Sequence, residues 1–333
     1  MNKFEKFKKN ISSNFNEAIK ITLSPSTSFR NRCEFGYSKN SYVMFKDDKK
    51  IYLDNFSIAS SSIRKIMPNL LSEIRKSEYL EKKLFQINFR SNSNNSVLAT
   101  LIYHKSITDE MIQQIETISK KLNINLIIRS KNYIYKTSDV YLEDHVNNII
   151  IYQTDNCFYQ PNRFLLTKMI NKVESYIEEP NDLLELYCGV GTFTLQLSNK
   201  FKYIFATESN RESIKCLDKA IKKNGLNNIF KSRLSAEELD EAFNGRIFYR
   251  MKDINLNSFN FSHVLVDPPR SGLTDEVINL ISKFKNIIYI SCNGETYIRD
   301  IKKLNSHKIK KLEIFDQFPN TDHMEVISLL SIT

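Results

Sequence analysis

The segment that constrains the fold most is a run of fourteen residues in the second half of the chain. Residues 182–195 read Asp-Leu-Leu-Glu-Leu-Tyr-Cys-Gly-Val-Gly-Thr-Phe-Thr-Leu, which is an apolar strand pattern, a glycine turn and the start of a helix pattern. Because Gly189 and Gly191 have no Cβ, the backbone of this turn can approach a ligand closely. Glu208 ends the next predicted strand, where a carboxylate can accept hydrogen bonds from ribose hydroxyls. On these residues alone, a tight turn without a ligand remains the alternative.

The elements around this turn alternate between helix and strand from about residue 158 onward. Such alternation predicts parallel strands joined by right-handed helical crossovers, a doubly wound α/β sheet of the Rossmann-like kind. Ligands of such sheets bind at the carboxyl ends of the strands. We expect strands at Asp182–Leu186, Tyr203–Ala206, Ile229–Arg233, His263–Val266 and Ile287–Ser291, and helices at Pro161–Glu178, Phe193–Asn199, Arg211–Asn224 and Asp275–Phe284.

The first half of the chain has a different pattern. A helical spacing of apolar residues covers residues 2–20, and short β-like runs then dominate as far as about Ile151. Runs of strands around two helices predict an α+β domain with the helices on one side of a sheet. The chain is therefore predicted to have two domains, residues 1–157 and residues 158–333. The expected strands are Cys33–Tyr37, Tyr42–Phe45, Lys50–Leu53, Leu84–Phe89, Val97–Tyr103, Asn125–Arg129 and Tyr133–Tyr135, with helices at Ser62–Lys76 and Asp109–Leu122.

Charge and cysteine content limit the class of protein. Residues 1–157 have 24 Lys and Arg against 16 Asp and Glu, whereas the remainder has 24 against 22. A basic first half favours a module that binds a polyanion such as nucleic acid, although lysines that only solvate the surface would give the same count. The five cysteines are scattered without a Cys-x-x-Cys pair, which argues against a zinc or iron–sulfur site and favours a reducing, cytoplasmic setting. No long apolar run or secretion signal indicates a membrane.

Residues suited to chemistry follow three of the predicted strands. Residues 264–271 read Val-Leu-Val-Asp-Pro-Pro-Arg-Ser, so Asp267 ends a strand and two prolines stiffen the loop after it. Cys292 ends the next apolar strand. A cysteine there is more often a packing residue, but its place at the ligand-binding edge makes it a candidate nucleophile. His323 and Glu325 precede the closing strand Val326–Leu330, which returns them to the same edge.

Longer motifs give these residues a specific resemblance. Glu-x-Tyr-Cys-Gly-x-Gly (185–191) resembles class I S-adenosylmethionine-dependent methyltransferases. Asp-Pro-Pro-Arg-x-Gly (267–272), Tyr-x-Ser-Cys-Asn-x-x-Thr (289–296) and Phe-Asp-x-Phe-Pro-x-Thr-x-His-x-Glu (315–325) resemble the RNA uracil-5-methyltransferase family, and within it the bacterial tRNA (uracil-5-)-methyltransferases. The motifs cover most of the second half. Asn320 and Gly294 depart from the residues usual in the family, and Thr192 stands where some members have Asn.

The resemblance implies a function and a set of site residues. It implies a class I methyltransferase domain behind an RNA-binding domain, with S-adenosylmethionine as cofactor and with neither a metal nor an iron–sulfur cluster. The expected substrate is the T-loop uridine (uridine-54) in the T-arm of tRNA, and other RNAs with a T-loop-like fold are possible partners of a monomeric enzyme. Cys292 would add to C6 of the uracil, and Glu325 would remove the proton from C5. The cofactor residues implied are Gln160, Tyr187, Thr192, Glu208 and Asp267.

Three alternatives remain at this point. A ribosomal-RNA uracil-5-methyltransferase would share the motifs, but several of those relatives have a cysteine-bound cluster and an added β-barrel, neither of which is indicated here. An RNA-binding or folding module with a vestigial methyltransferase core would not need Cys292 and Glu325. An amino-methyltransferase would need an aromatic residue where Arg270 stands. For RNA contacts, Phe85 and His104 are the candidates in the first half.

Overall fold

The computed structural model describes residues 2–46 and 48–332, and the chain forms two compact units. The large unit contains the N-terminal residues up to Ser24, the segment Val146–Ile151 and the chain from Cys157 onward. The small unit contains Pro25–His145 and Tyr152–Asn156. This differs from the predicted division, because the N-terminal residues belong with the second half of the chain.

A mixed sheet of eight strands forms the centre of the large unit. Its strand order is β1-β16-β17-β15-β14-β11-β12-β13, in which β17 runs antiparallel to both of its neighbours and the other pairings are parallel. The doubly wound parallel sheet predicted from the sequence is therefore confirmed. The strands are β1 (Lys20–Thr22), β11 (Asp182–Leu186), β12 (Tyr203–Thr207), β13 (Ile229–Ser232), β14 (Phe261–Val266), β15 (Asn286–Ser291), β16 (His307–Phe315) and β17 (Glu325–Ile332).

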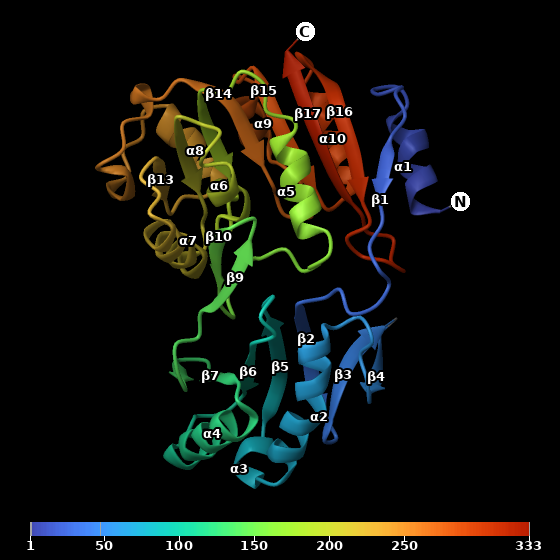
Figure 1. Cartoon of the computed structure of the whole chain (residues 1–333), viewed down its shortest axis with the longest axis vertical. Coiled ribbons are helices and arrows are strands. Elements are labelled where there is room, and N and C mark those ends of the chain that lie inside the picture. The colour runs from blue at the N-terminus through green and yellow to red at the C-terminus, as the bar shows by residue number, and fades with distance from the viewer. Residues whose placement is uncertain (1, 47, 333) are drawn as a thin grey trace. The chain divides into compact units, whose positions relative to one another are not determined.

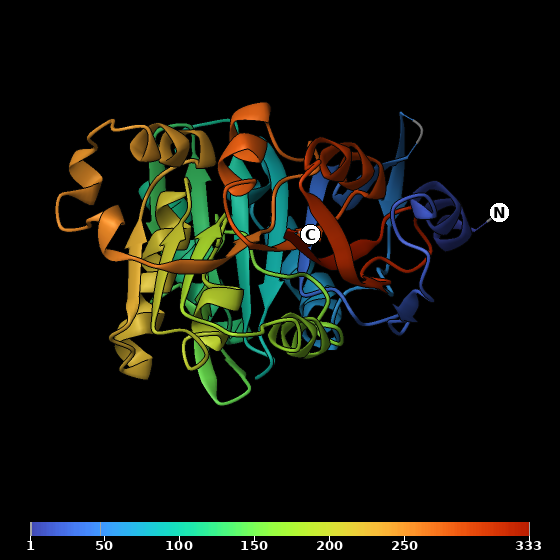
Figure 2. The same cartoon turned by 90° about the horizontal axis from the view of Figure 1, so that it is seen from above.

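Helices cover both faces of this sheet, as Figures 1 and 2 show. One face carries α5 (Leu166–Glu174), α6 (Thr192–Gln196) and α7 (Arg211–Asn224). The opposite face carries α8 (Ala236–Phe243), α9 (Asp275–Ile281) and α10 (Gly294–Lys303). The N-terminal helix α1 (Lys3–Ile11) packs beside α10. Two short 3₁₀ turns, Tyr249–Met251 and Leu256–Ser258, lie between α8 and β14.

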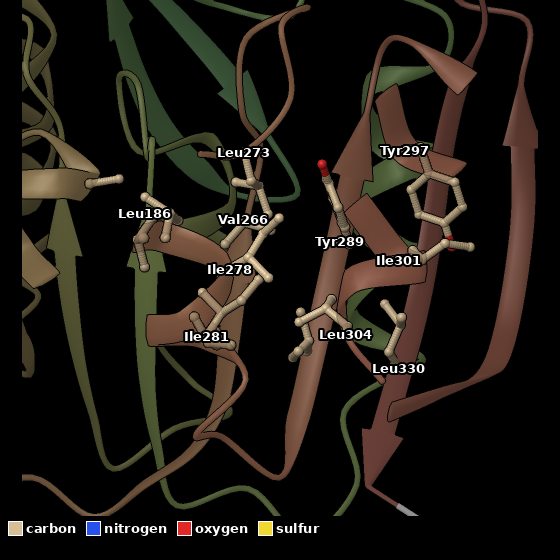
Figure 3. Close-up of a cluster of buried hydrophobic side chains, with 14 of the residues drawn as sticks. Leu186, Val266, Leu273, Ile278, Ile281, Tyr289, Tyr297, Ile301, Leu304 and Leu330 are labelled. Carbon is tan, nitrogen blue, oxygen red and sulfur yellow. The ribbon is translucent and has the colours of Figure 1, made fainter. Parts of the chain in front are cut away.

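The core on the α8–α10 face is built from alternate positions of the central strands. Successive side chains of a strand point to opposite faces, so Leu184 and Leu186 of β11 share this face with Val264 and Val266 of β14. Figure 3 shows Ile278 and Ile281 of α9 against this layer, and Tyr297, Ile301 and Leu304 beside Leu330 of β17. The helix α1 adds Phe7 and Ile11 to the same core, both of them buried.

The small unit is a two-layer α+β fold, as predicted. Its sheet has the strand order β4-β3-β2-β5-β6-β7-β8. The apolar sides of two helices, with Ile63 and Met111 among their buried residues, pack on one face of the sheet. The elements are β2 (Arg32–Ser38), β3 (Ser41–Lys46), β4 (Lys49–Leu53), α2 (Ser61–Arg75), α3 (Glu78–Glu81), β5 (Leu84–Ser91), β6 (Val97–Tyr103), α4 (Asp109–Leu122), β7 (Asn125–Ser130) and β8 (Tyr133–Lys136). A separate hairpin joins β9 (Leu142–Val146) to β10 (Ile149–Gln153).

Four predicted helices of the large unit have wrong bounds, and two helices of this unit were not predicted. The helix expected at Phe193–Asn199 ends at Gln196, and the helix expected at Asp275–Phe284 ends at Ile281. The N-terminal helix ends at Ile11 instead of near Lys20, because a polar turn follows and the chain then extends into β1. The helix expected from Pro161 begins at Leu166, because the Asn162 side chain accepts a hydrogen bond from the Phe164 N–H and forms a turn there. The unpredicted helices are α8 and α10.

The structural boundary also changes the distribution of charge. Counted over its own residues, the small unit has 19 Lys and Arg against 14 Asp and Glu, and the large unit has 29 against 24. The excess is therefore five positive charges in each unit. The basic excess predicted for residues 1–157 came in part from the lysines of α1, which belong to the large unit. Net charge alone does not distinguish the two units as binding surfaces for a polyanion.

Candidate active site

The residues predicted for the site gather at one edge of the large sheet. Tyr187 follows β11, Glu208 follows β12, Asp267 follows β14 and Cys292 follows β15. These four strands are parallel, so their carboxyl ends lie at the same edge, where ligands of such sheets bind. Glu325 begins the antiparallel strand β17 and so lies at this edge as well.

Both glycines of the turn after β11 adopt a left-handed backbone conformation that favours glycine. Gly189 has φ +55° and Gly191 has φ +85°, both in the left-handed region. A Cβ on Gly191 would lie 2.4 Å from Cδ1 of Leu217, so no side chain fits there without movement. The Gly189 N–H donates to Oε2 of Glu208 at 3.0 Å, and the Asn210 N–H donates to Oε1 at 2.7 Å. The Glu208 carboxylate is thereby held at the turn.

A cavity of about 220 Å³ lies beside this turn. Tyr187 and Glu208 contribute to its wall, and the residues after β13 and β14 complete it. An aromatic ring and a fixed carboxylate are suited to the base and the ribose hydroxyls of a nucleoside. The wall therefore fits the nucleoside part of S-adenosylmethionine. The lining residues are Tyr187, Glu208, Ser209, Leu234, Ser235, Ala236, Glu237, Pro269, Ser271, Gly272 and Thr274.

A chain of side-chain amides leads to Asp267. The Gln317 Nε2 donates to Oε1 of Gln160 at 2.8 Å, and the Gln160 Nε2 donates to Oδ2 of Asp267 at 3.2 Å. Asn162 Nδ2 donates to the backbone oxygen of Gln317 at 3.0 Å and so fixes the start of the chain. Gln160, Asn162 and Gln317 are buried, and Oε1 of Gln317 has no hydrogen-bond partner. These contacts determine which end of the Gln160 amide faces the Asp267 carboxylate.

Strand pairing brings Cys292 and Glu325 together. In the antiparallel pair of β15 and β17, Ser291 lies opposite Val326. Continuing that register by one residue places Cys292 opposite Glu325. Cys292 is partly exposed and Glu325 is buried, with 3% of its surface accessible. A thiol and a carboxyl group are thus adjacent at the edge where the cavity opens.

The site disfavours negative charge. Burial raises the pKa of the Cys292 thiol to about 12, and the carboxylates of Glu325 and Asp267 add to the rise while Arg270 opposes it. Burial also raises the pKa of Glu325 well above its ordinary value, with Asp267 adding to the rise, and burial raises the pKa of Asp267. A carboxylate whose pKa is raised is a stronger base than an ordinary carboxylate, which is typical of proton-transfer sites.

A buried carboxylate holds the loop from Asp267 to Gly272 in place. Oδ2 of Asp300, which is fully buried, accepts from the Leu273 N–H at 2.8 Å and from the Tyr289 hydroxyl at 2.6 Å. Arg299 pairs with Asp300 at 2.7 Å and donates to the backbone oxygen of Ser271 at 2.9 Å. The loop is therefore anchored to α10, the helix that begins two residues after Cys292.

Two residues predicted near the site, Thr192 and His323, lie outside the lining of the cavity. Thr192 is the buried first residue of α6, directly after the glycine turn, and does not line the cavity. His323 is exposed, and its ring meets Phe318 edge-on. Gln317, Asn162 and Asp300 were not predicted from the sequence. A signal existed for Gln317, which is a polar residue inside the Phe-Asp-x-Phe-Pro motif.

The described residues contain neither a metal-binding cluster nor a membrane-spanning helix. Residues 2–46 and 48–332 contain no group of three or more His, Cys, Asp or Glu side chains placed to hold a metal ion. Within the same residues, no helix has both the length and the apolar character needed to cross a membrane.

Comparison with known proteins agrees with the geometry. The sheet order, the glycine turn and the cavity beside it fit a class I S-adenosylmethionine-dependent methyltransferase. The family tRNA (Uracil-5-)-methyltransferase matches residues 1–332. The chain belongs to this family.

Two relatives and one solved structure are similar over nearly the whole chain. The tRNA/tmRNA (uracil-C(5))-methyltransferase of Campylobacter concisus is 41% identical over 340 residues, covering 98% of this chain and 92% of the relative. That of Saccharophagus degradans is 40% identical over 326 residues, covering 92% and 88%. The crystal structure of the Pyrococcus abyssi tRNA (uracil-54, C5)-methyltransferase with S-adenosyl-L-homocysteine has a TM-score of 0.77 at 20% identity, covering 98% of this chain and 82% of that one. At that identity the likeness concerns the fold.

Proposed function

We propose that this tRNA uracil-C5-methyltransferase acts on the T-loop uridine through a covalent adduct with Cys292. The observation that carries the proposal is the register of β15 and β17, which places the Cys292 thiol opposite the Glu325 carboxyl group. Uracil C5 is too weak a nucleophile to accept a methyl group unaided, so the ring must first be activated by addition at C6. The reaction needs a nucleophile that adds to C6 and a base that removes the proton from C5. A thiol beside a carboxyl group can supply both.

The steps follow from these two side chains. The Cys292 thiolate adds to C6, which breaks the C5–C6 double bond and leaves an enolate with electron density on C5. S-adenosylmethionine, when bound, supplies the methyl group that C5 takes up. Glu325 then accepts the proton from C5, the bond between sulfur and C6 breaks, and the double bond returns. The raised pKa of Glu325 suits a group that takes a proton from carbon and releases it to water.

Five residues are proposed to hold the cofactor. Glu208 would accept hydrogen bonds from the ribose hydroxyls and Tyr187 would pack on the nucleoside, since both line the cavity. Gln160 and Asp267 would bind the amino-acid end through the polar chain that joins them. Thr192 would act from the helix start beside the turn.

The small unit is proposed as the RNA-binding domain. The rings of Phe85 and His104 stack at 4.1 Å between centroids, and both side chains are exposed. Lys82, Lys83 and Lys105 lie in the same segments, and the His104 N–H donates to the Lys83 backbone oxygen. An exposed aromatic platform with cations around it suits unstacked bases and phosphates. Its partner would be the T-arm of tRNA with its loop opened. Other RNAs with a similar loop would bind in the same way.

The cellular setting is proposed from the thiols. All five cysteines lie among the described residues and are free, which fits a reducing cytoplasm. We further propose that the enzyme acts as a monomer, because the thiol, the carboxyl groups and the cavity all come from one chain.

The decisive experiment maps the methyl group. Bulk tRNA and ribosomal RNA incubated with labelled S-adenosylmethionine should gain label at one T-loop uridine of tRNA. Cys292→Ala should abolish the transfer and leave cofactor binding nearly intact, because the thiol acts on the base. Turnover by Cys292→Ala would rule out the covalent route, and label in ribosomal RNA alone would reassign the substrate.

For the RNA-binding proposal, Phe85→Ala should weaken tRNA binding by the full-length enzyme by about 1–3 kcal/mol, the contribution of one stacked base. Phe45→Ala is the matched control, since Phe45 is an exposed phenylalanine on another strand of the same sheet. Equal tRNA affinities for the two variants would move the contact elsewhere.

A further inference from the structure

The N-terminal helix α1 touches both segments that carry the proposed chemistry. One segment is the loop of residues 316–324, which joins β16 to β17 and ends just before Glu325. The other is the start of α10, two residues after Cys292. Since α1 and these segments are more than 280 residues apart in sequence, the contacts arise from the fold and not from chain proximity.

The first contact is made by a single ammonium group. Lys3 Nζ donates to Oδ1 of Asp316 at 2.6 Å, to the backbone oxygen of Phe318 at 3.1 Å and to that of His323 at 2.8 Å. Only 11% of the Lys3 side chain and 12% of the Asp316 side chain are exposed, so water screens the pair weakly. An ammonium has three donors, and here all three go to one loop. Lys3 therefore joins the start of the loop to its end.

The second contact is made by an aromatic ring. Phe7 is buried against the first residue of α10, and a Cβ on Gly294 would lie only 2.7 Å from Cδ2 of Phe7. The Phe7 ring also lies 6.1 Å from the ring of Tyr297, one turn further along α10. The absence of a side chain at Gly294 lets the ring sit directly on the turn that follows Cys292.

Docking α1 to the unit does not itself require Lys3. Phe7 and Ile11 bury the apolar side of the helix, which is the usual basis of helix attachment. Taking an ammonium and a carboxylate out of water costs free energy that their attraction only partly returns. A buried pair that also fastens two backbone oxygens is thus better explained by the geometry it imposes on the loop.

We propose that α1 is a positioning element, in which Lys3 fixes the loop before Glu325 and Phe7 fixes the turn after Cys292. One rigid helix then sets the spacing between the nucleophile and the base. The proposal rests on the proposed roles of Cys292 and Glu325. Lys3 and Phe7 are positioning residues, because neither reaches the reacting atoms.

The test compares Lys3→Met with Lys9→Met in the full chain. Both remove one lysine from α1, but Lys9 is exposed. Lys3→Met should lower kcat about tenfold, since small misplacements of reacting groups have effects of this size. Its KM for tRNA and its S-adenosylmethionine affinity should stay within about twofold of the Lys9→Met values, because neither binding surface is touched. Lys3→Arg, which retains a cation with several donors, should recover part of the rate.

A trapping assay identifies the step affected. RNA with 5-fluorouridine should trap wild type, Lys3→Met and Lys9→Met alike in the presence of S-adenosylmethionine, because trapping needs addition of Cys292 and methyl transfer but no proton removal from C5. With ordinary tRNA, Lys3→Met should accumulate a methylated covalent adduct, since proton removal by the displaced Glu325 is slowed. Equal kcat and no adduct in Lys3→Met and Lys9→Met would overturn the positioning role. Failure of the wild type itself to trap fluorinated RNA would instead overturn the proposed covalent function.

A second pair of variants addresses Phe7 without emptying the core. Gly294→Ala puts a methyl group against the Phe7 ring and should lower kcat, whereas Phe7→Leu with Gly294→Ala should restore it by making room. Circular dichroism and cofactor titration on each variant verify the fold. A Gly294→Ala rate that is normal, or that Phe7→Leu fails to restore, would contradict the contact.

Discussion

Replacing Gln317 with methionine should separate stability from cofactor binding. Methionine has nearly the same size and shape, so packing is retained. The change removes the donor to Gln160 and leaves Oε1 of Gln160 unpaired in a buried site, which costs about 1–3 kcal/mol. It also removes Oε1 of Gln317, which is buried without a partner and carries a desolvation penalty of about the same 1–3 kcal/mol. The two effects oppose, so the free energy of unfolding should change by less than about 1 kcal/mol.

Cofactor binding has no such compensation. Without the Gln317 donor, the Gln160 amide is free to turn, and its hydrogen bond to Asp267 is no longer enforced. Loss of one positioned hydrogen bond to a charged group corresponds to about tenfold weaker S-adenosylmethionine binding. Urea unfolding and calorimetric titration of Gln317→Met measure the two quantities on one sample. Unchanged cofactor affinity, or a loss of more than about 2 kcal/mol in stability, would refute the reasoning about this chain of amides.

Two further predictions concern pH and the glycine turn. Burial raises the pKa of Glu185 to about 8. The folded state therefore keeps a proton at pH values where Glu185 of the unfolded chain, with its ordinary pKa, has already lost it. The contribution of this group to stability is present at acid pH and is lost as pH rises. Between about pH 5 and 8, this carboxyl group should lower the free energy of unfolding of the wild type by roughly 1.4 kcal/mol per pH unit. Urea unfolding of Glu185→Gln should therefore give a free energy of unfolding that depends less on pH. An equal slope in the two proteins would contradict the prediction. Gly191→Ala should cost about 2–5 kcal/mol in thermal or urea unfolding, from left-handed backbone strain and from the clash with Leu217, and an alanine tolerated without loss would contradict the turn geometry.

Six of the eight strands of the large sheet were predicted, because they are short apolar runs that end in turn residues, whereas β1 and β16 were not predicted. The bounds of β11 and α7 agree with the predictions residue for residue, and Asn210 and Gly225 flank α7. The helix α10 was not predicted. It begins at Gly294, a poor helix former, where Asn293 caps it and Phe7 packs on it. The cap is a local cause, but the packing of Phe7 is a tertiary one that the local sequence does not show.

The candidate site was predictable where a motif names a residue, as for Cys292 and Glu325. Their juxtaposition depends on β17 being antiparallel, which the sequence pattern does not state. Asp300 and Lys3 act through partners far along the chain, so local spacing holds no trace of them, whereas Gln317 is at least a polar residue inside a motif. The N-terminal residues were assigned to the first domain for the same reason, because only the pairing of β1 with β16 shows where they belong.

The most direct test of the account is the behaviour of Glu325→Gln with ordinary tRNA. Glutamine retains the shape and hydrogen bonding of the side chain but cannot take the proton from C5. Addition of Cys292 and methyl transfer should proceed, and elimination should stop. A methylated tRNA joined to the protein should therefore accumulate, visible as a slow band on a denaturing gel and absent in Cys292→Ala. Free methylated tRNA produced at the wild-type rate, with no adduct, would contradict the pairing of Cys292 and Glu325 as nucleophile and base.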